Sequence, residues 1–211
     1  ICILKPIYLG PRIETVMIGS LLVMNDWRKF WKDIWDSKGI SDSDNLLFLD
    51  GYDHLDQNFC SESIVKDIVD CLGVENCDTV LEVGCGAGFL AREMQNFKYF
   101  GVDYSEPIIK KHKTLFPAHN VLVSESNLLP FGDKSFDFVF CFGLFQYLPN
   151  FDYAEKTILE MERVCKTKIF LGDLKNKKTR DMHFVYPVQN LIEMGYNTTK
   201  CVYDKNDKTR F

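Results

Sequence analysis

The feature that most constrains the fold is a glycine-rich stretch at residues 80–90. An apolar run at 80–83 predicts a buried strand, glycines follow at alternate positions from 84 to 88, and the next residues favour a helix. Glycines allow a sharp turn and let a ligand approach the backbone without meeting a Cβ. A strand, a glycine turn and a helix N-terminus in this order predict a site for a nucleotide-like ligand. The alternative is a turn that only packs the helix onto the strand.

The spacing of the glycines separates classes of nucleotide site. A dinucleotide fingerprint has glycines at its first, third and sixth positions, whereas Gly84, Gly86 and Gly88 take the first, third and fifth. No Lys-Ser or Lys-Thr pair follows, which excludes a phosphate-binding P-loop. Asp103 ends the next predicted strand, where an acid can accept both ribose hydroxyls. Its alternative role is to cap the helix that begins after Ser105.

Composition narrows the class of protein. The 211 residues suit one ordinary domain, and 46% hydrophobic with 26% charged residues indicates a globular chain. The net charge of −5 disfavours a non-specific grip on nucleic acid. The eight cysteines lack zinc-ligand spacing, so we expect no metal site and a reducing, cytoplasmic compartment. The apolar stretch at 16–23 is too short to span a bilayer.

Predicted strands and helices alternate along the chain, which implies βαβ units and a mostly parallel sheet. Strands are predicted at 79–83, 98–103, 120–123, 136–142 and 168–171. Helices are predicted at 61–72, 89–96, 106–116, 153–166 and 187–194, with a closing hairpin at 200–203 and 209–211.

The N-terminal part divides into residues 1–24, an arm of undetermined status, and 25–60, a helical cap before a core at 61–211. Trp27, Trp31 and Trp35 recur on one face of a predicted helix that Asn25 and Asp26 would cap. This helix either packs on the core or forms a lid over the site, and the two roles are compatible.

Further sequence motifs occur in the order that is typical of one known protein family. Glu82 precedes the Gly-x-Gly-x-Gly turn, and Glu125 precedes a Leu-Pro-Phe turn at 129–131 and a Ser-Phe-Asp strand start at 135–137. This pattern, over roughly residues 61–175, resembles the class I S-adenosylmethionine-dependent methyltransferases, and their small-molecule branch in particular, which includes the ubiquinone and menaquinone biosynthesis enzymes. The resemblance implies a three-layer, Rossmann-like α/β fold. Its mostly parallel seven-stranded sheet would carry helices on both faces and one antiparallel strand near the C-terminus.

The resemblance also implies a cofactor, S-adenosylmethionine. Glu82 and the amides of the glycine turn would hold its methionine end, Asp103 its ribose and Glu125 its adenine. The family more often has Asp at the position of Glu125 and His at that of Gln146. The candidate cofactor-binding residues are Glu82, Gly84, Cys85, Gly86, Gly88, Asp103, Tyr104, Glu125, Ser126, Asn127 and Cys141.

The implied reaction is methyl transfer by direct displacement to an oxygen or nitrogen of a small molecule. Tyr147 and His183 are the candidates for a general base, and packing or a surface role is the alternative for each. Tyr52 is a candidate for an aromatic ring over the cofactor, and Asp173 either touches the acceptor or caps a turn. A basic cluster indicates either an anionic acceptor or a solvated loop, and its members are Lys175, Lys177, Lys178 and Arg180.

Two functions of other classes stay open. One is an NAD-dependent oxidoreductase on the same kind of fold, which the glycine spacing opposes. The other is a cofactor-binding subunit without its own activity, which would dock on a partner through the tryptophan helix. The sequence does not indicate an oligomeric state.

Overall fold

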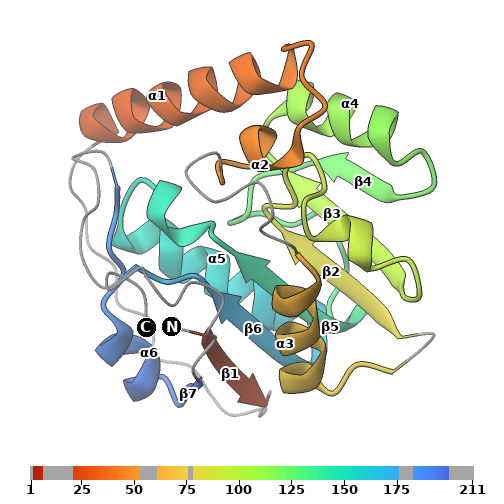
Figure 1. Cartoon of the computed structure of the whole chain (residues 1–211). Coiled ribbons are helices and arrows are strands. Elements are labelled where there is room, and N and C mark those ends of the chain that lie inside the picture. Colours follow the sequence, from red (N-terminus) through yellow and green to blue (C-terminus); the bar gives the residue numbers. More distant parts are fainter. Residues whose placement is uncertain (1, 7–20, 53–60, 76–77, 176–182, 200–211) are drawn as a thin grey trace.

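The structure is a computed structural model that describes residues 2–6, 21–52, 61–75, 78–175 and 183–199 (Figure 1). These residues form one seven-stranded sheet in the order β4-β3-β2-β5-β6-β1-β7. Strands β4, β3, β2, β5 and β6 run parallel, and β1 runs antiparallel to β6 and β7. The strand bounds are β1 (Cys2–Pro6), β2 (Thr79–Val83), β3 (Lys98–Asp103), β4 (Asn120–Val123), β5 (Phe136–Phe142), β6 (Cys165–Gly172) and β7 (Asn197–Thr199).

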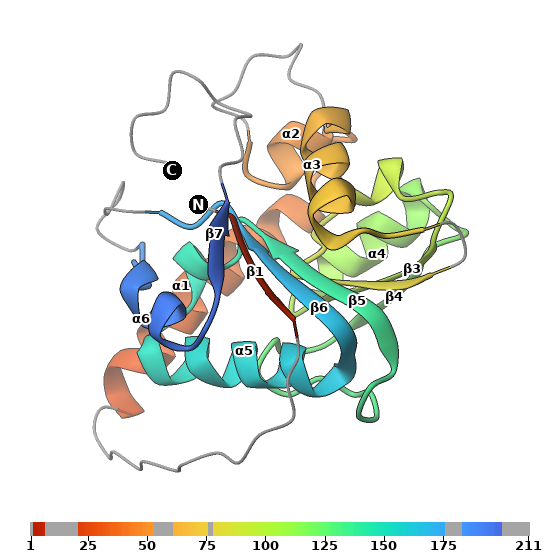
Figure 2. The same cartoon turned by 90° about the horizontal axis from the view of Figure 1, so that it is seen from below.

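Helices cover both faces of this sheet and give the molecule three layers (Figure 2). Helices α3 and α4 pack on one face, α5 and α6 on the other, and α1 crosses one end of the sheet. The predicted Rossmann-like α/β fold is therefore confirmed. The helical elements are α1 (Leu21–Gly39), α2 (Leu46–Leu49), α3 (Glu62–Leu72), the 3₁₀ turn η1 (Ala91–Glu93), α4 (Glu106–Leu115), the 3₁₀ turn η2 (Phe145–Tyr147), α5 (Phe151–Val164) and α6 (Val188–Glu193).

Alternate residues of the central strands feed two hydrophobic clusters. In β2, Leu81 and Val83 belong to the cluster beneath α5, whereas Val80 belongs to the cluster beneath α3. Strand β5 is buried along most of its length, as a continuous apolar run between two helix layers should be.

The order of the strands reverses between β2 and β5. Strands β3 and β4 extend the sheet on one side of β2, and β5 and β6 extend it on the other. Open α/β sheets bind ligands outside the carboxyl ends of their strands at such a point. The glycine turn that follows β2 and the segment that follows β5 therefore meet at the expected ligand edge.

The helix predicted at 89–96 is wrong, because only the three-residue turn η1 follows the glycine turn. The glycine turn uses much of the chain between Val83 and Lys98. The remainder is shorter than the ten or so residues of a usual crossover helix. The glycine turn therefore does not lead into a long helix whose dipole could attract a ligand. Polar contacts to the turn must come from other groups.

The antiparallel strand predicted near the C-terminus is instead β1. It lies between β6 and β7, with Ile3 opposite Leu171 and Cys2 opposite Thr199. Strand β6 would otherwise leave a row of backbone groups unpaired at its edge, and an extended apolar segment can satisfy them from either chain direction. The hairpin predicted at 200–203 and 209–211 lies outside the described residues.

Helix α1 begins at Leu21, so the predicted cap at Asn25 and Asp26 is wrong. Its last residue, Gly39, allows close approach to α4, because a Cβ there would lie 2.5 Å from the backbone nitrogen of Ile108. This contact fixes α1 across the ligand edge. No helix in the described part of the chain is both long and apolar enough to cross a membrane. The division at residues 24 and 60 stays a prediction.

Candidate functional site

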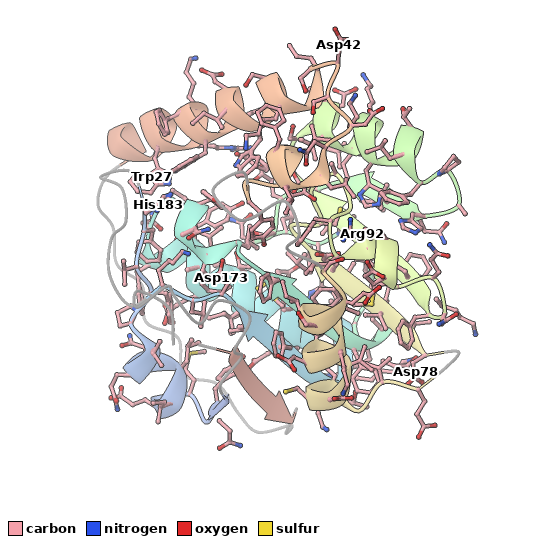
Figure 3. All side chains as sticks on the ribbon, viewed as in Figure 1. Trp27, Asp42, Asp78, Arg92, Asp173 and His183 are labelled. Carbon is pink, nitrogen blue, oxygen red and sulfur yellow. The ribbon has the colours of Figure 1, made fainter. Side chains whose placement is uncertain are left out.

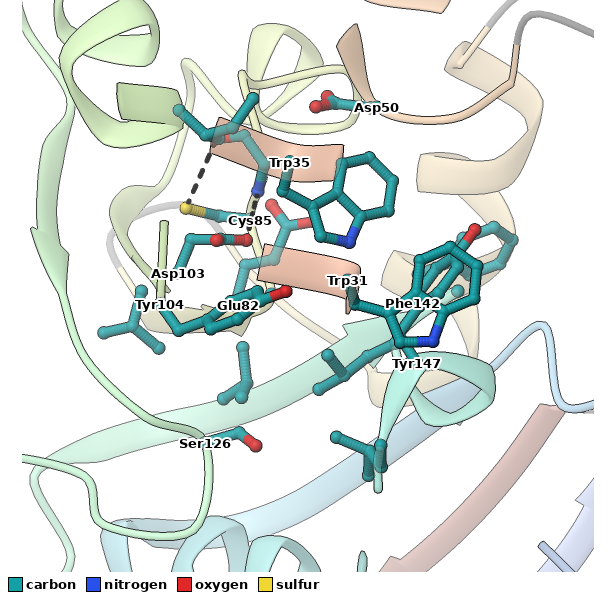
Figure 4. Close-up of a pocket in the computed structure, with 18 of the residues that line it drawn as sticks. Trp31, Trp35, Asp50, Glu82, Cys85, Asp103, Tyr104, Ser126, Phe142 and Tyr147 are labelled. Atoms are coloured by element: carbon teal, nitrogen blue, oxygen red, sulfur yellow. Dashed lines mark hydrogen bonds between the residues drawn. The ribbon is translucent and has the colours of Figure 1, made fainter. Parts of the chain in front are cut away.

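A cavity lies at the carboxyl ends of β2, β3, β4 and β5, beneath α1 (Figure 4). Its floor comes from the glycine turn and from the segments that follow the other strands. Its roof comes from α1 and the residues after α2. Among the predicted residues, those in its wall are Tyr52, Glu82, Gly84, Cys85, Gly86, Asp103, Tyr104, Glu125, Ser126 and Tyr147. Gly88, Asn127, Cys141 and His183 lie outside this wall.

The glycine turn is held entirely by partners within the protein. Each backbone N–H from Gly84 to Phe89 donates a hydrogen bond, and the acceptors are Val102 O, Cys85 O and the carboxylates of Asp50 and Asp103. Gly88 has φ +105°, and a Cβ there would lie 2.8 Å from the Phe116 ring, so this glycine serves packing on α4. The turn therefore shapes the cavity, and side chains supply its charge.

Two predicted acids stand beside the turn. Glu82 is only 3% exposed and accepts a hydrogen bond from the Tyr99 hydroxyl at 2.7 Å. Burial raises its pKa well above the usual value, and nearby Asp50 and Asp103 raise it further. Asp103 accepts from Gly86 N at 3.2 Å and from Ser105 N at 3.0 Å. Burial raises the pKa of Asp103 to about 6.

The alternative role of Asp103 as a helix cap does not account for its position. Ser105 is the N-cap of α4, and its own hydroxyl accepts from Ile108 N. Asp103 instead lines the cavity and braces the glycine turn.

Glu125 is held from two sides of the cavity. It accepts a hydrogen bond from the Tyr153 hydroxyl of α5 at 2.6 Å and forms an ion pair with Arg28 of α1. Its neighbour Ser126 is buried and shares a hydrogen bond of 2.9 Å with Thr157. The acid after β4 therefore ties the roof of the cavity to its floor.

Aromatic rings line another part of the cavity. The Tyr147 ring lies 4.7 Å from that of Trp31 and 5.1 Å from that of Trp35, measured between centroids. Trp27 Nε1 donates to Tyr147 O at 3.3 Å. The tryptophan helix thus packs on the molecule and covers the cavity, so its two predicted roles occur together.

The remaining candidates have positions that explain why they do not line the wall. His183 is buried, stacks on Trp31 with centroids 5.3 Å apart, and lies 5.6 Å from the Tyr147 ring. Cys141 is fully buried in the cluster beneath α5. Gln146 Nε2 donates to Gly143 O at 3.2 Å, so this side chain turns to the backbone.

Sequence reasoning missed Asp50 and Arg28, which both line the cavity. Asp50 reaches the glycine turn, and Arg28 reaches Glu125. An aspartate before a glycine in a polar segment predicts only a turn, and an arginine on an exposed helix face predicts only solubility. The three tryptophans on one face of α1 were the one sequence signal that the N-terminal segment could cover the site.

Comparison with known proteins agrees with these motifs. A family model described as a methyltransferase domain matches residues 81–170. The chain is 29% identical over 129 residues to the probable methyltransferase ltbC of Aspergillus luteorubrus, which covers 54% of this chain and 44% of that protein. It is 27% identical over 159 residues to the uncharacterized protein MJ1252 of Methanocaldococcus jannaschii, which covers 75% and 59%. The chain thus spans about half the length of these curated relatives.

A solved structure shows the same fold. Phosphoethanolamine N-methyltransferase 1 of Haemonchus contortus, in complex with phosphoethanolamine and S-adenosylhomocysteine, superposes with a TM-score of 0.65 at 18% identity. The match covers 81% of this chain and 40% of that chain. This structure shows the fold, and the methyltransferase domain at residues 81–170 agrees with the predicted resemblance to class I S-adenosylmethionine-dependent methyltransferases.

Proposed function

We propose that the chain is an enzyme that transfers a methyl group from S-adenosylmethionine to an oxygen or nitrogen of a small molecule. The observation that carries this proposal is the cavity beneath α1. Trp31 and Trp35 of α1 and Tyr147 of η2 cover the same edge to which the motif residues contribute. A cavity that aromatic rings cover in part suits a small organic acceptor, whereas a polymer needs a long open groove.

The residues around the cavity fit the cofactor. S-adenosylmethionine carries a positive sulfonium and a positive ammonium group, and Asp50, Glu82 and Asp103 place carboxylates in the wall. In the proposal, Asp103 accepts the ribose hydroxyls and Glu125 the adenine amino group. Arg28 and Tyr153 keep Glu125 in place for that contact.

The chemistry divides between cofactor and protein. The cofactor supplies an electrophilic methyl group, and the chain binds and orients both reactants. In the proposal, the aromatic rings of α1 and η2 limit the access of water to the cavity. An anionic acceptor stays part of the proposal, although Lys175 already lies 3.4 Å from Asp173 and the other members of the basic cluster lie outside the described residues. A cytoplasmic location also stays a proposal, and the free thiols of Cys85, Cys141 and Cys165 support it.

Tyr147 is the base candidate that lines the cavity, and in the proposal its phenolate oxygen takes the proton that a hydroxyl or ammonium acceptor must lose. Tyr147→Phe keeps the ring between Trp31 and Trp35 and should lower kcat about 100-fold without changing the affinity for the cofactor. His183→Gln should leave kcat within about threefold, because His183 is not among the residues that line the cavity. The check is a steady-state assay of both variants, and a Tyr147→Phe rate equal to wild type would remove the assignment.

Formation of S-adenosylhomocysteine during incubation with a panel of small hydroxyl and amine acceptors tests the function. Release above the rate without acceptor is the expected result. A protein that binds S-adenosylmethionine but releases no S-adenosylhomocysteine with any acceptor would favour the alternative of a cofactor-binding subunit without its own activity. The match to the methyltransferase model argues against the NAD-dependent alternative, and a parallel titration with NAD should show no binding.

A further inference from the structure

Asp50 reaches the glycine turn from the N-terminal segment. Its two carboxylate oxygens accept hydrogen bonds from Ala87 N at 2.6 Å and from Phe89 N at 2.7 Å. A Cβ on Gly86 would lie 2.2 Å from Asp50 Oδ1, so the carboxylate fills the space beside this glycine. Figure 4 draws Asp50 among the side chains that line the cavity. The sequence motif alone therefore does not complete the turn in this chain, because a distant carboxylate does.

Several titratable groups face Asp50 from different elements. Burial raises the pKa of Asp50 to about 7, although its two backbone hydrogen bonds act in the opposite direction. The charge of Asp103 raises this pKa further, and that of Lys38 lowers it. The groups that interact with Asp50 are Lys38 of α1, Glu82 of β2, Cys85 of the glycine turn, Tyr99 of β3 and Asp103 at the end of β3.

We propose that Asp50 is a positioning residue of the cofactor site, which fixes the glycine turn and faces the ammonium group at the methionine end of the ligand. This inference rests on the proposed function, because it requires an S-adenosyl ligand in the cavity. Carboxylates that share one cavity repel each other, and a bound cation favours their ionised forms. Ligand binding and ionisation of Asp50 are therefore coupled, and the free protein gives up a proton when the ligand binds.

The direction of the pH dependence follows from these groups. Asp50 is mostly protonated near pH 6 and mostly ionised near pH 8, so a ligand that needs the ionised form gains about tenfold in affinity over that interval. Ionisation of Asp103 over the same pH interval raises the affinity about twofold for any ligand whose ribose it holds. S-adenosylhomocysteine carries the ammonium group, whereas methylthioadenosine keeps the ribose and the thioether but lacks the amino-acid end. The two ligands therefore separate the carboxylates at the amino-acid end, Asp50 and Glu82, from Asp103 at the ribose, and Asp50→Asn isolates the contribution of Asp50.

Calorimetric titration of the full chain with both ligands, near pH 6 and near pH 8, tests the inference. Affinity should rise about 20-fold for S-adenosylhomocysteine and about twofold for methylthioadenosine. Asp50→Asn should weaken S-adenosylhomocysteine about tenfold or more at the higher pH and reduce its pH dependence to about twofold. The same substitution should leave the affinity for methylthioadenosine unchanged. Asp42→Asn is the matched control, since Asp42 is exposed and lies at the outside of the molecule (Figure 3).

A second measurement on the wild type keeps the test decisive if Asp50→Asn fails to fold. Titrations in two buffers of different ionisation enthalpy, near pH 6.5, should show release of about one proton with S-adenosylhomocysteine and about a quarter of a proton with methylthioadenosine. Equal proton release with both ligands would overturn the role of Asp50. Binding of S-adenosylhomocysteine by Asp50→Asn that is as tight as, or tighter than, binding by the wild type would overturn it as well. Failure of every adenosyl ligand to bind would instead contradict the proposed function.

Discussion

Replacing Gly86 by alanine should abolish measurable binding of S-adenosylhomocysteine and lower the free energy of unfolding by about 3 kcal/mol. Two costs add at this position. Gly86 has φ +51°, a left-handed conformation that costs a residue with a Cβ about 1–2 kcal/mol. The new methyl group would also lie 2.2 Å from Asp50 Oδ1, and such overpacking typically costs about 1–3 kcal/mol. Urea denaturation and calorimetric titration measure the two effects.

The double variant with Asp50→Ala separates the two costs. Removal of the carboxylate should relieve the clash, so the two substitutions should deviate from additivity by about 1–2 kcal/mol. Gly132→Ala is the matched control, because its Cβ would meet only Ser135 Oγ at 3.6 Å, an ordinary contact. Strict additivity of Gly86→Ala and Asp50→Ala would show that Asp50 does not set the need for glycine here.

Asp103→Asn should weaken the binding of S-adenosylhomocysteine about 100-fold, which corresponds to about 2.7 kcal/mol. An ionised carboxylate can accept hydrogen bonds from both ribose hydroxyls, and bonds to a charged group contribute about 1.5–3 kcal/mol each. Asparagine keeps the shape but offers a single oxygen acceptor, and its amide group would face a donor. Calorimetry near pH 8 measures the loss, since Asp103 is ionised there in the wild type.

The control for this variant is Glu106→Gln, which neutralises an exposed acid on α4 three residues along the chain. Its affinity for S-adenosylhomocysteine should match that of the wild type. An Asp103→Asn protein that is fully folded and binds within about threefold of the wild type would remove the ribose role. Asp103 would then serve only to brace Gly86 and Ser105.

Local sequence determined most of the sheet. The strands predicted at 79–83, 98–103, 120–123 and 136–142 agree with β2, β3, β4 and β5 at both ends. These strands are apolar runs bounded by turn-forming residues, so neighbouring residues alone mark their limits. The sequence predictions were wrong where contacts between distant parts of the chain determine the structure. Strand β1 depends on an edge that β6 offers far along the chain, and η1 depends on the length left after the glycine turn.

The same distinction holds for the site. Glu82, Asp103 and Glu125 line one cavity because they lie at or just beyond parallel strands whose carboxyl ends share an edge of the sheet. Sequence motifs could therefore find them. Arg28 reaches the same cavity from α1, which docks on α4 through Gly39, and Asp50 reaches it from the end of α2. No local sequence pattern reports these distant contacts.

Calorimetric titration of the folded full chain with S-adenosylhomocysteine near pH 8 tests the central claim most directly. We predict saturable binding at about one site per chain, competition by S-adenosylmethionine, and no heat of binding with NAD. A protein that is folded by circular dichroism and yet binds neither adenosyl ligand would contradict the assignment of this cavity.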